Sequence, residues 1–356
     1  MNAPKATRRP TVLTAHGDDR VDEWYWMADR DDPELIPHLE AENEHCAEAL
    51  AHTKDLQQEL FEEMVARIQE TDLSVPVRKG RWWYLNRTVE GQQYAILCRR
   101  QGRADGPETV LLDQNLLAEG HEFLHVTNTV VSPDTNLLAY ATDYDGGERF
   151  TLRVRDLTTG SDLADEVPDV SYGLAWSADS ATLFYVRVDE SMRPWQLWRH
   201  RLGSTVADDV LVHQEDDERF YLHVSGTRTE RLVMLVLESK TTSEVWFLDA
   251  AGPEGDFQVV EPRRQGVEYG VDHHGVEAGG ERFFIVTNAD GAENFKLVEA
   301  PVTTPGRDHW TEVVGHRPDV KLDGVDVFAD HLVLFEKTEG LRRIAVRRLA
   351  DGTTHT

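Results

Sequence analysis

The sequence predicts an all-β fold, a β-propeller built from four-stranded blades, with an α-helical segment in front of it. Three observations lead to this fold class. From residue 76 onward, short apolar runs alternate with turns, which is typical of strands. These runs recur at steps of 53, 45, 48, 54 and 50 residues, the spacing of propeller blades. Residues 1–75 instead place their apolar side chains at helical spacing.

Residues 1–75 are predicted to form a helical segment with two helices and almost no strand signal. Asp32-Pro33 marks the start of the first helix, because aspartate caps a helix N-terminus and proline fits the first helical position. The second helix is expected from about Thr53 to Gln69. Each helix has an apolar face, formed by Leu35, Ile36, Leu39, Cys46, Ala49 and Leu50 in the first and by Leu56, Leu60, Phe61, Met64, Val65 and Ile68 in the second. Two helices cannot fully cover each other, so a further surface is expected to pack on them.

The propeller is predicted to span residues 76–356. Each repeat consists of a turn, an apolar strand, a polar hairpin turn and a second strand. The six repeats begin at Lys79, Ser132, Ser177, Ser225, Gly279 and Ala329. One blade cannot bury both of its faces alone. Because the sequence stops directly after the sixth strand pair, an incomplete ring is expected.

Composition limits the classes of partner. The 37 Lys and Arg residues against 65 Asp and Glu give a net charge of −28, which repels nucleic acid. No apolar run reaches the roughly 18 residues of a membrane span, so no membrane partner is expected either. Cys46 and Cys98 form no CxxC motif and are predicted to be buried thiols. A reducing compartment, the cytoplasm, is the expected location.

The sharpest local motif is His121-Glu122-Phe123-Leu124-His125, which fits the HExxH pattern of zinc peptidases. That chemistry needs a helix, so that both histidines face one metal ion. Here Gly120 precedes the motif and the strand-like residues 126–131 follow it, so no metal site is predicted.

Other catalytic motifs are missing from the sequence. It contains no G-x-S-x-G nucleophile elbow and neither of the glycine-rich phosphate-binding patterns, so no cofactor is expected. The acids Asp216, Asp217 and Glu218 could perform acid/base chemistry, as in propeller glycosidases, or could belong to an ordinary loop between blades.

Several segments, taken in order, resemble the N-terminal half of oligopeptidase B, the trypsin-like branch of the prolyl oligopeptidase family of serine peptidases. The likeness runs from about Thr14 to the C-terminus. It is carried by residues 22–43, 70–76, 239–250, 266–275 and 288–298.

The resemblance implies a seven-bladed propeller joined to an α/β-hydrolase domain that carries Ser, Asp and His. In that family the N-terminal helices pack on the hydrolase domain, and the propeller admits only short peptides, which are cut after Lys or Arg. Because this sequence ends at Thr356, before a seventh blade and the hydrolase domain, it should contain no catalytic residue and be inactive alone. The implied partners are short basic peptides and the protein's own C-terminal hydrolase domain.

Salt bridges across the cleft between the two domains control opening in the family. Glu122 and Arg149, each just outside a predicted blade strand, are candidates for such gating residues, with ordinary surface charges as the alternative. A second hypothesis for the chain is a stand-alone propeller that binds or scaffolds without catalysis. The two apolar helices count against it, because a lone propeller has no use for them.

Overall fold

The computed structural model describes residues 3–275 and 280–356. The chain divides into two compact units, one formed by Met1–Asp72 and Thr88–Gly91 and the other by Leu73–Arg87 and Gln92–Thr356. The predicted start of the fifth repeat, Gly279, lies outside the described residues.

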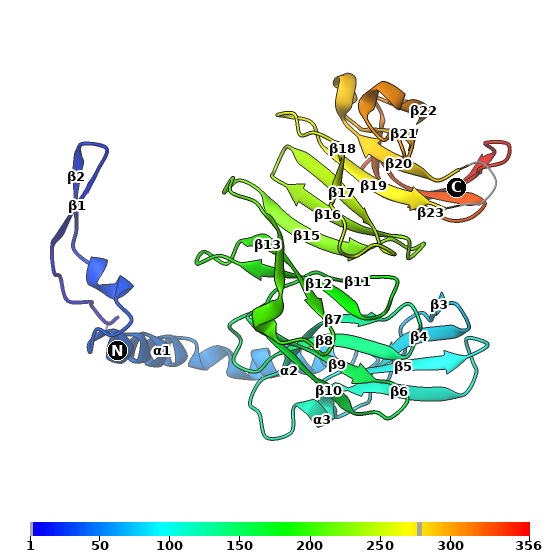
Figure 1. The fold of residues 1–356 in the computed structure, drawn as a ribbon. Coiled ribbons are helices and arrows are strands. Elements are labelled where there is room, and N and C mark those ends of the chain that lie inside the picture. Colours follow the sequence, from blue (N-terminus) through cyan, green and yellow to red (C-terminus); the bar gives the residue numbers. More distant parts are fainter. Residues whose placement is uncertain (1–2, 276–279) are drawn as a thin grey trace. The chain divides into compact units, whose positions relative to one another are not determined.

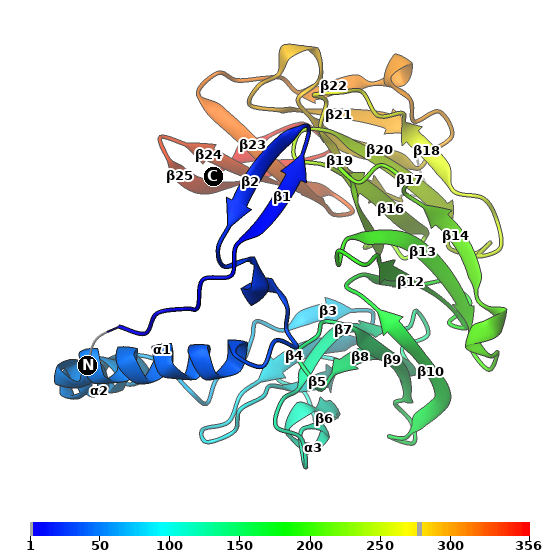
Figure 2. The same cartoon turned by 90° about the vertical axis from the view of Figure 1, so that its left-hand side faces the viewer.

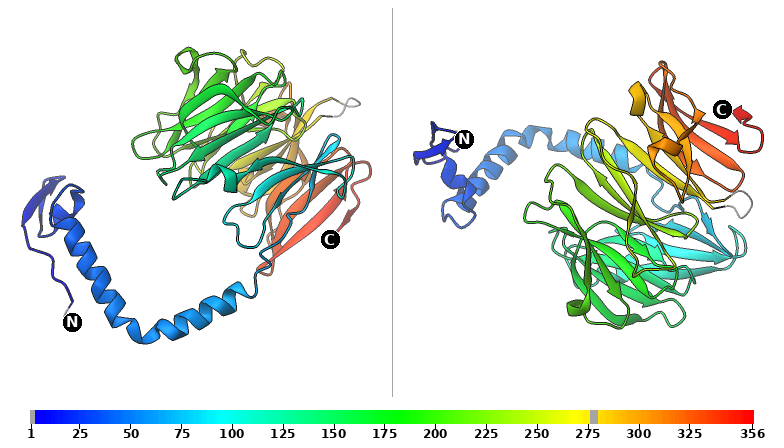
Figure 3. Two further views of the ribbon diagram at one scale, coloured as in Figure 1. Left: turned by 90° about the horizontal axis from the view of Figure 1, so that it is seen from below. Right: turned by 45° about the horizontal axis from the view of Figure 1, so that its top comes forward.

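The first unit contains a β-hairpin followed by helices (Figure 2). Its elements are β1 (Thr11–Ala15), β2 (Asp18–Asp22), a 3-10 turn (Tyr25–Ala28), α1 (Leu35–Ala49), a second 3-10 turn (Ala51–Thr53) and α2 (Lys54–Val65). The chain bends at the second 3-10 turn, between α1 and α2 (Figure 3). The first helix begins later than predicted. The Asp32 carboxylate still accepts the N–H of Glu34, in a turn just ahead of the helix.

The hairpin corrects the expectation that residues 1–75 form a helical segment with almost no strand. It is closed by the two-residue turn His16-Gly17, in which both residues have positive φ (55° and 81°). Such a turn matches the twist of paired strands and favours glycine. A His-Gly pair is a weaker signal than Asn-Gly or Asp-Gly, and the flanking apolar alternation is short.

The helices of the first unit expose most of their apolar side chains. In α1 only Leu35 is buried, and α2 contains no buried residue. Phe61 is 57% exposed. The other exposed apolar residues of this region are Ile36, Leu39, Leu50, Leu56, Leu60, Met64 and Ile68.

The second unit consists of six antiparallel four-stranded sheets within the described residues. Sheet 1 comprises β3 (Val77–Lys79), β4 (Trp82–Arg87), β5 (Ile96–Gln101) and β6 (Glu108–Asp113), and sheet 2 comprises β7 (His125–Val131), β8 (Leu137–Asp143), β9 (Phe150–Asp156) and β10 (Asp162–Val170). Sheet 3 comprises β11 (Leu174–Trp176), β12 (Thr182–Val188), β13 (Pro194–Arg201) and β14 (Val210–Gln214), and sheet 4 comprises β15 (Tyr221–Gly226), β16 (Leu232–Glu238), β17 (Ser243–Asp249) and β18 (Gln258–Glu261). Sheet 5 comprises β19 (Tyr269–His274), β20 (Arg282–Thr287), β21 (Lys296–Pro301) and β22 (Thr311–Val314), and sheet 6 comprises β23 (Val320–Val327), β24 (His331–Thr338), β25 (Leu341–Arg348) and β26 (Thr354–His355). The short helix α3 (Gln114–Leu117) joins sheets 1 and 2, and further 3-10 turns span Val206–Asp208, Ala289–Gly291 and Arg307–His309.

The sheets follow one another in chain order around a common axis (Figure 1). The first strands of neighbouring sheets contact each other, as β7 and β15 both do with β11, and therefore lie innermost. The described repeat starts fall at or next to the connection between the first and second strands of a sheet. The sequence repeats thus located the second and third strands and missed the first and fourth. The β-propeller fold and the N-terminal helices are confirmed.

Sheets 2 to 5 are each sandwiched between two neighbouring sheets of the chain. In β20, Phe283 and Ile285 pack in a hydrophobic cluster with sheet 4, and Phe284 and Val286 pack in another with sheet 6. Successive strand residues point to opposite faces, so burial of both faces explains the continuous apolar run. Five such clusters link sheet 1 to 2, 2 to 3, 3 to 4, 4 to 5 and 5 to 6. Over residues 3–275 and 280–356, no cluster links sheet 6 to sheet 1.

Sheet 6 has one covered and one open apolar face. Leu332 and Leu334 pack against sheet 5. Phe335 and its cross-strand partner Ile344 belong to the opposite face and are 37% and 57% exposed. The ring of sheets therefore ends on a surface that resembles the blade-facing surfaces of the other sheets.

Candidate functional site

The two ends of the propeller differ in the connections they carry. At the end called here the loop end, the first strand of each sheet begins, and the connections between sheets and between second and third strands gather there. At the opposite end, the turn end, the first and second strands are joined. Glu122 lies just before β7 and Arg149 directly before β9, so both predicted gating residues belong to the loop end of sheet 2.

The loop that carries Arg149 is held rigidly. The buried Asp143 carboxylate accepts the N–H groups of Asp145, Gly146 and Glu148. Burial would raise the pKa of Asp143, but these donors lower it below the usual range. Glu148 adopts a positive φ of 55° inside this loop, directly before Arg149.

The segment that carries Glu122 lies against the same loop. The rings of His121 and Tyr144 are 4.0 Å apart, and the aromatic ring of Phe123 lies close to Gly146. Glu122 and Arg149 are both exposed. Across the described parts of the chain, neither side chain makes a hydrogen bond or ion pair, so the fold brings their segments together and leaves both charges available to solvent.

The HExxH segment is not helical. It runs through an irregular segment and enters strand β7 at His125, as the strand-like sequence after it suggested. Among residues 3–275 and 280–356, no three His, Cys, Asp or Glu side chains are placed to hold a metal ion.

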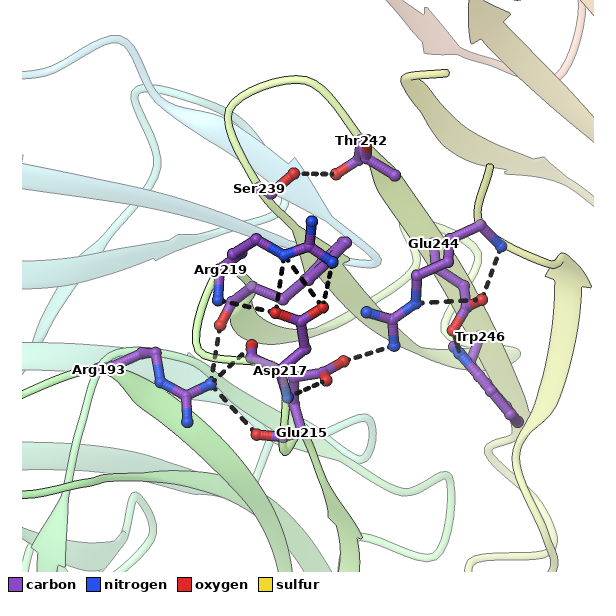
Figure 4. Close-up of polar contacts among 10 residues, drawn as sticks. Arg193, Glu215, Asp217, Arg219, Ser239, Thr242, Glu244 and Trp246 are labelled. Atoms are coloured by element: carbon purple, nitrogen blue, oxygen red, sulfur yellow. Dashed lines mark hydrogen bonds and ion pairs between the residues drawn. The ribbon is translucent and has the colours of Figure 1, made fainter. Parts of the chain in front are cut away.

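A second part of the loop end is organised by Arg193 (Figure 4). Its side chain is buried, and one terminal nitrogen donates to the backbone carbonyls of Glu215, Asp217 and Phe220 at 3.1, 3.3 and 3.1 Å. Its Nε donates to the Asp189 carboxylate at 2.9 Å. One guanidinium therefore binds the connection between sheets 3 and 4 to a loop of sheet 3.

Two buried carboxylates extend this network into sheet 4. Glu215 lies 2.6 Å from the Arg263 guanidinium and also accepts the N–H of Asp217. Glu244 accepts the backbone N–H of Arg263 at 2.7 Å and the indole N–H of Trp246 at 2.8 Å. Buried carboxylates need such donors, because leaving one unpaired is costly.

Asp217 and Arg219 form an exposed ion pair on the same connection. The hydrogen bond from the Arg219 side chain is the main cause that lowers the pKa of Asp217 to about 2. The Asp216-Asp217-Glu218 segment is therefore part of a loop between two sheets, the simpler of its two interpretations.

Two cavities open beside this loop. One of about 600 Å³ is lined by Glu218, Arg219, Tyr221, His223, Glu238, Ser239, Lys240, Thr241 and Gln265. The other, of about 500 Å³, shares Glu238 and Ser239 and extends along the first strands of sheets 5 and 6 to Asp272, Lys321 and Asp323. Acids and bases balance in the first lining, whereas in the second lining four Asp and Glu residues face one Lys, so the two linings together carry an excess of acids. The cavities are large enough for several side chains of a peptide.

Two ionisable groups in these linings are perturbed. The hydrogen bond from His223 lowers the pKa of Glu238, with a 3.3 Å separation between the two side chains. Burial raises the pKa of Asp272, even though its carboxylate accepts the N–H groups of His273 and Val327. These groups were not identified from sequence. No local motif surrounds them: His223 and Glu238 lie on different strands, and Val327 belongs to sheet 6, whereas Asp272 belongs to sheet 5.

The two cysteines differ in exposure. Cys98 is buried, and burial raises its pKa, whereas Cys46 is exposed, which corrects the expectation that both are buried.

In the part of the chain that the structure describes, no helix combines the length and apolar character required to cross a bilayer.

Comparison with known proteins gives one family. Residues 4–356 match the family described as prolyl oligopeptidase, N-terminal beta-propeller domain. The chain is 38% identical to dipeptidyl aminopeptidase BI of Pseudoxanthomonas mexicana, with 99% of the chain and 50% of the relative aligned. It is 36% identical to Protease 2 of Moraxella lacunata, over 97% of the chain and 50% of the relative.

Solved structures agree. Oligopeptidase B from Leishmania major superimposes with a TM-score of 0.89 at 29% identity, over 99% of this chain and 52% of that one. The chain spans about half the length of the curated relatives it matches. It belongs to the prolyl oligopeptidase family of serine peptidases, within which it matches the N-terminal β-propeller domain.

Proposed function

We propose that the chain is the propeller half of an oligopeptidase B-like serine peptidase that cuts short peptides after Lys or Arg. In this proposal the Ser, Asp and His of catalysis belong to a hydrolase domain beyond Thr356. The propeller restricts which peptides reach that domain, and residues 1–356 alone do not hydrolyse peptides.

One observation carries the proposal: the whole chain corresponds to the propeller half of peptidases twice its length. Two surfaces support it. The open face of sheet 6, with Phe335 and Ile344, suits a seventh blade that completes the ring. The exposed apolar residues of α1 and α2 suit the hydrolase domain, which would cover the helical segment 1–75.

The first test is the mass of the native protein in its source cells. A product about twice as long as residues 1–356 would fit an added seventh blade and hydrolase domain, since the chain covers 50% of its relatives. A stable product of 356 residues would instead favour the stand-alone binding or scaffold propeller. Fractionation of the same cells tests the proposed cytoplasmic location. The protein should be recovered in the fraction that contains cytoplasmic marker proteins.

A second candidate activity comes from the relative named dipeptidyl aminopeptidase, to which the chain is 38% identical. An enzyme of that kind releases dipeptides from a free N-terminus, whereas an endopeptidase also cuts N-terminally blocked peptides. The complete protein should therefore be assayed on a blocked Arg-Arg fluorogenic substrate and on an unblocked dipeptide substrate with the same leaving group. Cleavage of the unblocked substrate alone would replace the oligopeptidase proposal with the aminopeptidase.

The loop-end charges are proposed to take part in gating. Glu122 and Arg149 have no partner in the described chain, so each is free to pair with a neighbouring domain across the cleft. Arg149→Ala in the complete protein should change peptide turnover without altering the unfolding midpoint. The matched control is Arg103→Ala, because Arg103 is an exposed arginine at the turn end. Equal turnover of short and longer peptides by wild type and Arg149→Ala would contradict the gating role.

The preference for basic peptides is supported by charge. A net charge of −28 and the excess of acids around the two cavities attract cationic ligands over distances set by ionic strength. The rate constant for a dibasic peptide at low substrate concentration should therefore fall as salt is raised, while that for a peptide with a single basic residue should fall less. Equal salt dependence of the two would remove this part of the proposal.

A further inference from the structure

The turn between β15 and β16, residues Thr227–Arg231, links sheets that are far apart in the ring. Glu230 forms a 2.5 Å ion pair with Lys79 of sheet 1. Arg228 forms a 3.2 Å ion pair with Asp326 of sheet 6. We call this segment of sheet 4 the cross-ring turn.

The cross-ring turn also contacts its neighbour, sheet 5. The Thr229 hydroxyl lies 2.6 Å from Nδ1 of His273, and Arg231 pairs with Glu281 at 2.8 Å. Arg228 additionally lies over the ring of Phe328, 4.5 Å from its centroid, next to the end of sheet 6. Four consecutive residues, 228–231, thus contact three other sheets from one turn.

The backbone of this turn does not require these charges. Equivalent turns join the first and second strands of sheets 2 and 3. Thr135 and Ser180 occupy the position of Glu230 in these turns, and all three residues have positive φ. Between their ends, the turns of sheets 2 and 3 have only small or acidic side chains. The turn of sheet 4 has the sequence Thr-Arg-Thr-Glu-Arg and so contains two arginines. The charged side chains are therefore particular to the turn that crosses the ring.

Lys79 supplies a second anchor. Besides the ion pair with Glu230, its ammonium donates to the Val131 carbonyl of sheet 2 at 3.0 Å. The first strand of sheet 1 is thereby tied both to the adjacent sheet and to a sheet on another part of the ring. Sheets 1 and 6 are the two ends of the row of sheets, and no hydrophobic cluster joins them within the described residues.

We propose that the cross-ring turn is a clamp that limits how far sheets 1 and 6 separate. Glu230 holds the first sheet through Lys79, and Arg228 holds the sixth through Asp326. The four side chains are partly exposed, between 32% and 47%, so salt screens both ion pairs and the clamp can release. This inference concerns the ring alone and is independent of any peptide substrate.

The test measures the distance between sheets 1 and 6 by double electron–electron resonance in the intact protein. Nitroxide labels are attached at Thr109→Cys on β6 and Arg342→Cys on β25, both exposed, in a Cys46→Ser background, because Cys98 is buried. We expect the double variant Glu230→Gln, Asp326→Asn to give a longer and broader distance distribution, shifted by more than the wild-type width. Wild type in 1 M salt, where the Debye length falls to about 3 Å, should move in the same direction.

Two controls make the result specific. Asp105→Asn removes an exposed ion pair with Arg103 that lies within sheet 1, and it should leave the distribution unchanged. Glu230→Lys, which places a second cation beside Lys79 but leaves the bond from Lys79 to the Val131 carbonyl in place, should broaden the distribution more than Glu230→Gln. The clamp is wrong if the double variant and high salt both leave the distance unchanged, or if Asp105→Asn broadens it equally. The salt series needs no substitution in the turn, so the test survives a variant that folds poorly.

Discussion

Replacing Arg193 by methionine should be among the most destabilising substitutions at the loop end. The side chain is 8% exposed and donates to the Asp189 carboxylate and to three backbone carbonyls. Methionine keeps much of the volume but removes every donor. Glu215 and Phe220 are themselves buried, so their carbonyls would lose their partner where water has little access.

The magnitude follows from these contacts. Each buried carbonyl left unpaired costs about 1–3 kcal/mol, and loss of the charged partner of Asp189 adds about 1–2 kcal/mol. The free energy of unfolding should therefore fall by at least about 3 kcal/mol in Arg193→Met, the sum of the lower limits for the two buried carbonyls and Asp189. Because loop 215–220 lines the larger cavity through Glu218 and Arg219, the loop should also become more mobile.

The assay is urea unfolding followed by tryptophan fluorescence, with hydrogen exchange of residues 215–220 as a local readout. Arg219→Met is the matched control. It also removes an arginine from this loop, but one whose side chain is 67% exposed, so its unfolding midpoint should fall much less than that of Arg193→Met. A loss below about 1 kcal/mol in Arg193→Met, the size of one ordinary hydrogen bond, would refute the view that this arginine organises the loop end.

Three further predictions follow from other contacts. Tyr185→Phe removes a buried hydroxyl that donates to Asp209 at 2.8 Å and should lower the free energy of unfolding by about 1–2 kcal/mol, whereas Tyr221→Phe, an exposed tyrosine, should not change the urea midpoint. The pKa of Asp217 is lowered from 3.8 to about 2, so its pairing with Arg219 contributes stability above pH 4 and loses it as the pH falls through 2; a carboxyl chemical-shift titration with a midpoint near 3.8 would contradict this. Exposed Cys46 should react with a thiol reagent in the native state and buried Cys98 only on unfolding, so two equally fast reactions under native conditions would disagree with the structure.

The fold class was accessible from sequence for a physical reason. A propeller sheet is buried on both faces, which requires continuous apolar runs such as Phe283–Val286, and the same unit is repeated at a nearly constant step. Amphipathic spacing likewise identified α1 and α2. The β1–β2 hairpin escaped prediction because its strands are short and its turn is His16-Gly17, and the fourth strand of sheet 6 escaped because it has only two residues, Thr354–His355.

The sites depended on tertiary structure to different degrees. The sequence placed Glu122 and Arg149 outside strands, but only the fold brings both to the loop end of sheet 2, and their gating role stays a prediction. Arg193 and its carbonyl acceptors, Lys79 and Glu230, and Arg228 and Asp326 are pairs of common surface residue types with no local motif between them. A strand pattern determines which residues face a neighbouring sheet, because that depends only on alternation along one chain segment. Which charge pairs with which across the ring depends on how six sheets are arranged around one axis, and only the tertiary structure decides it.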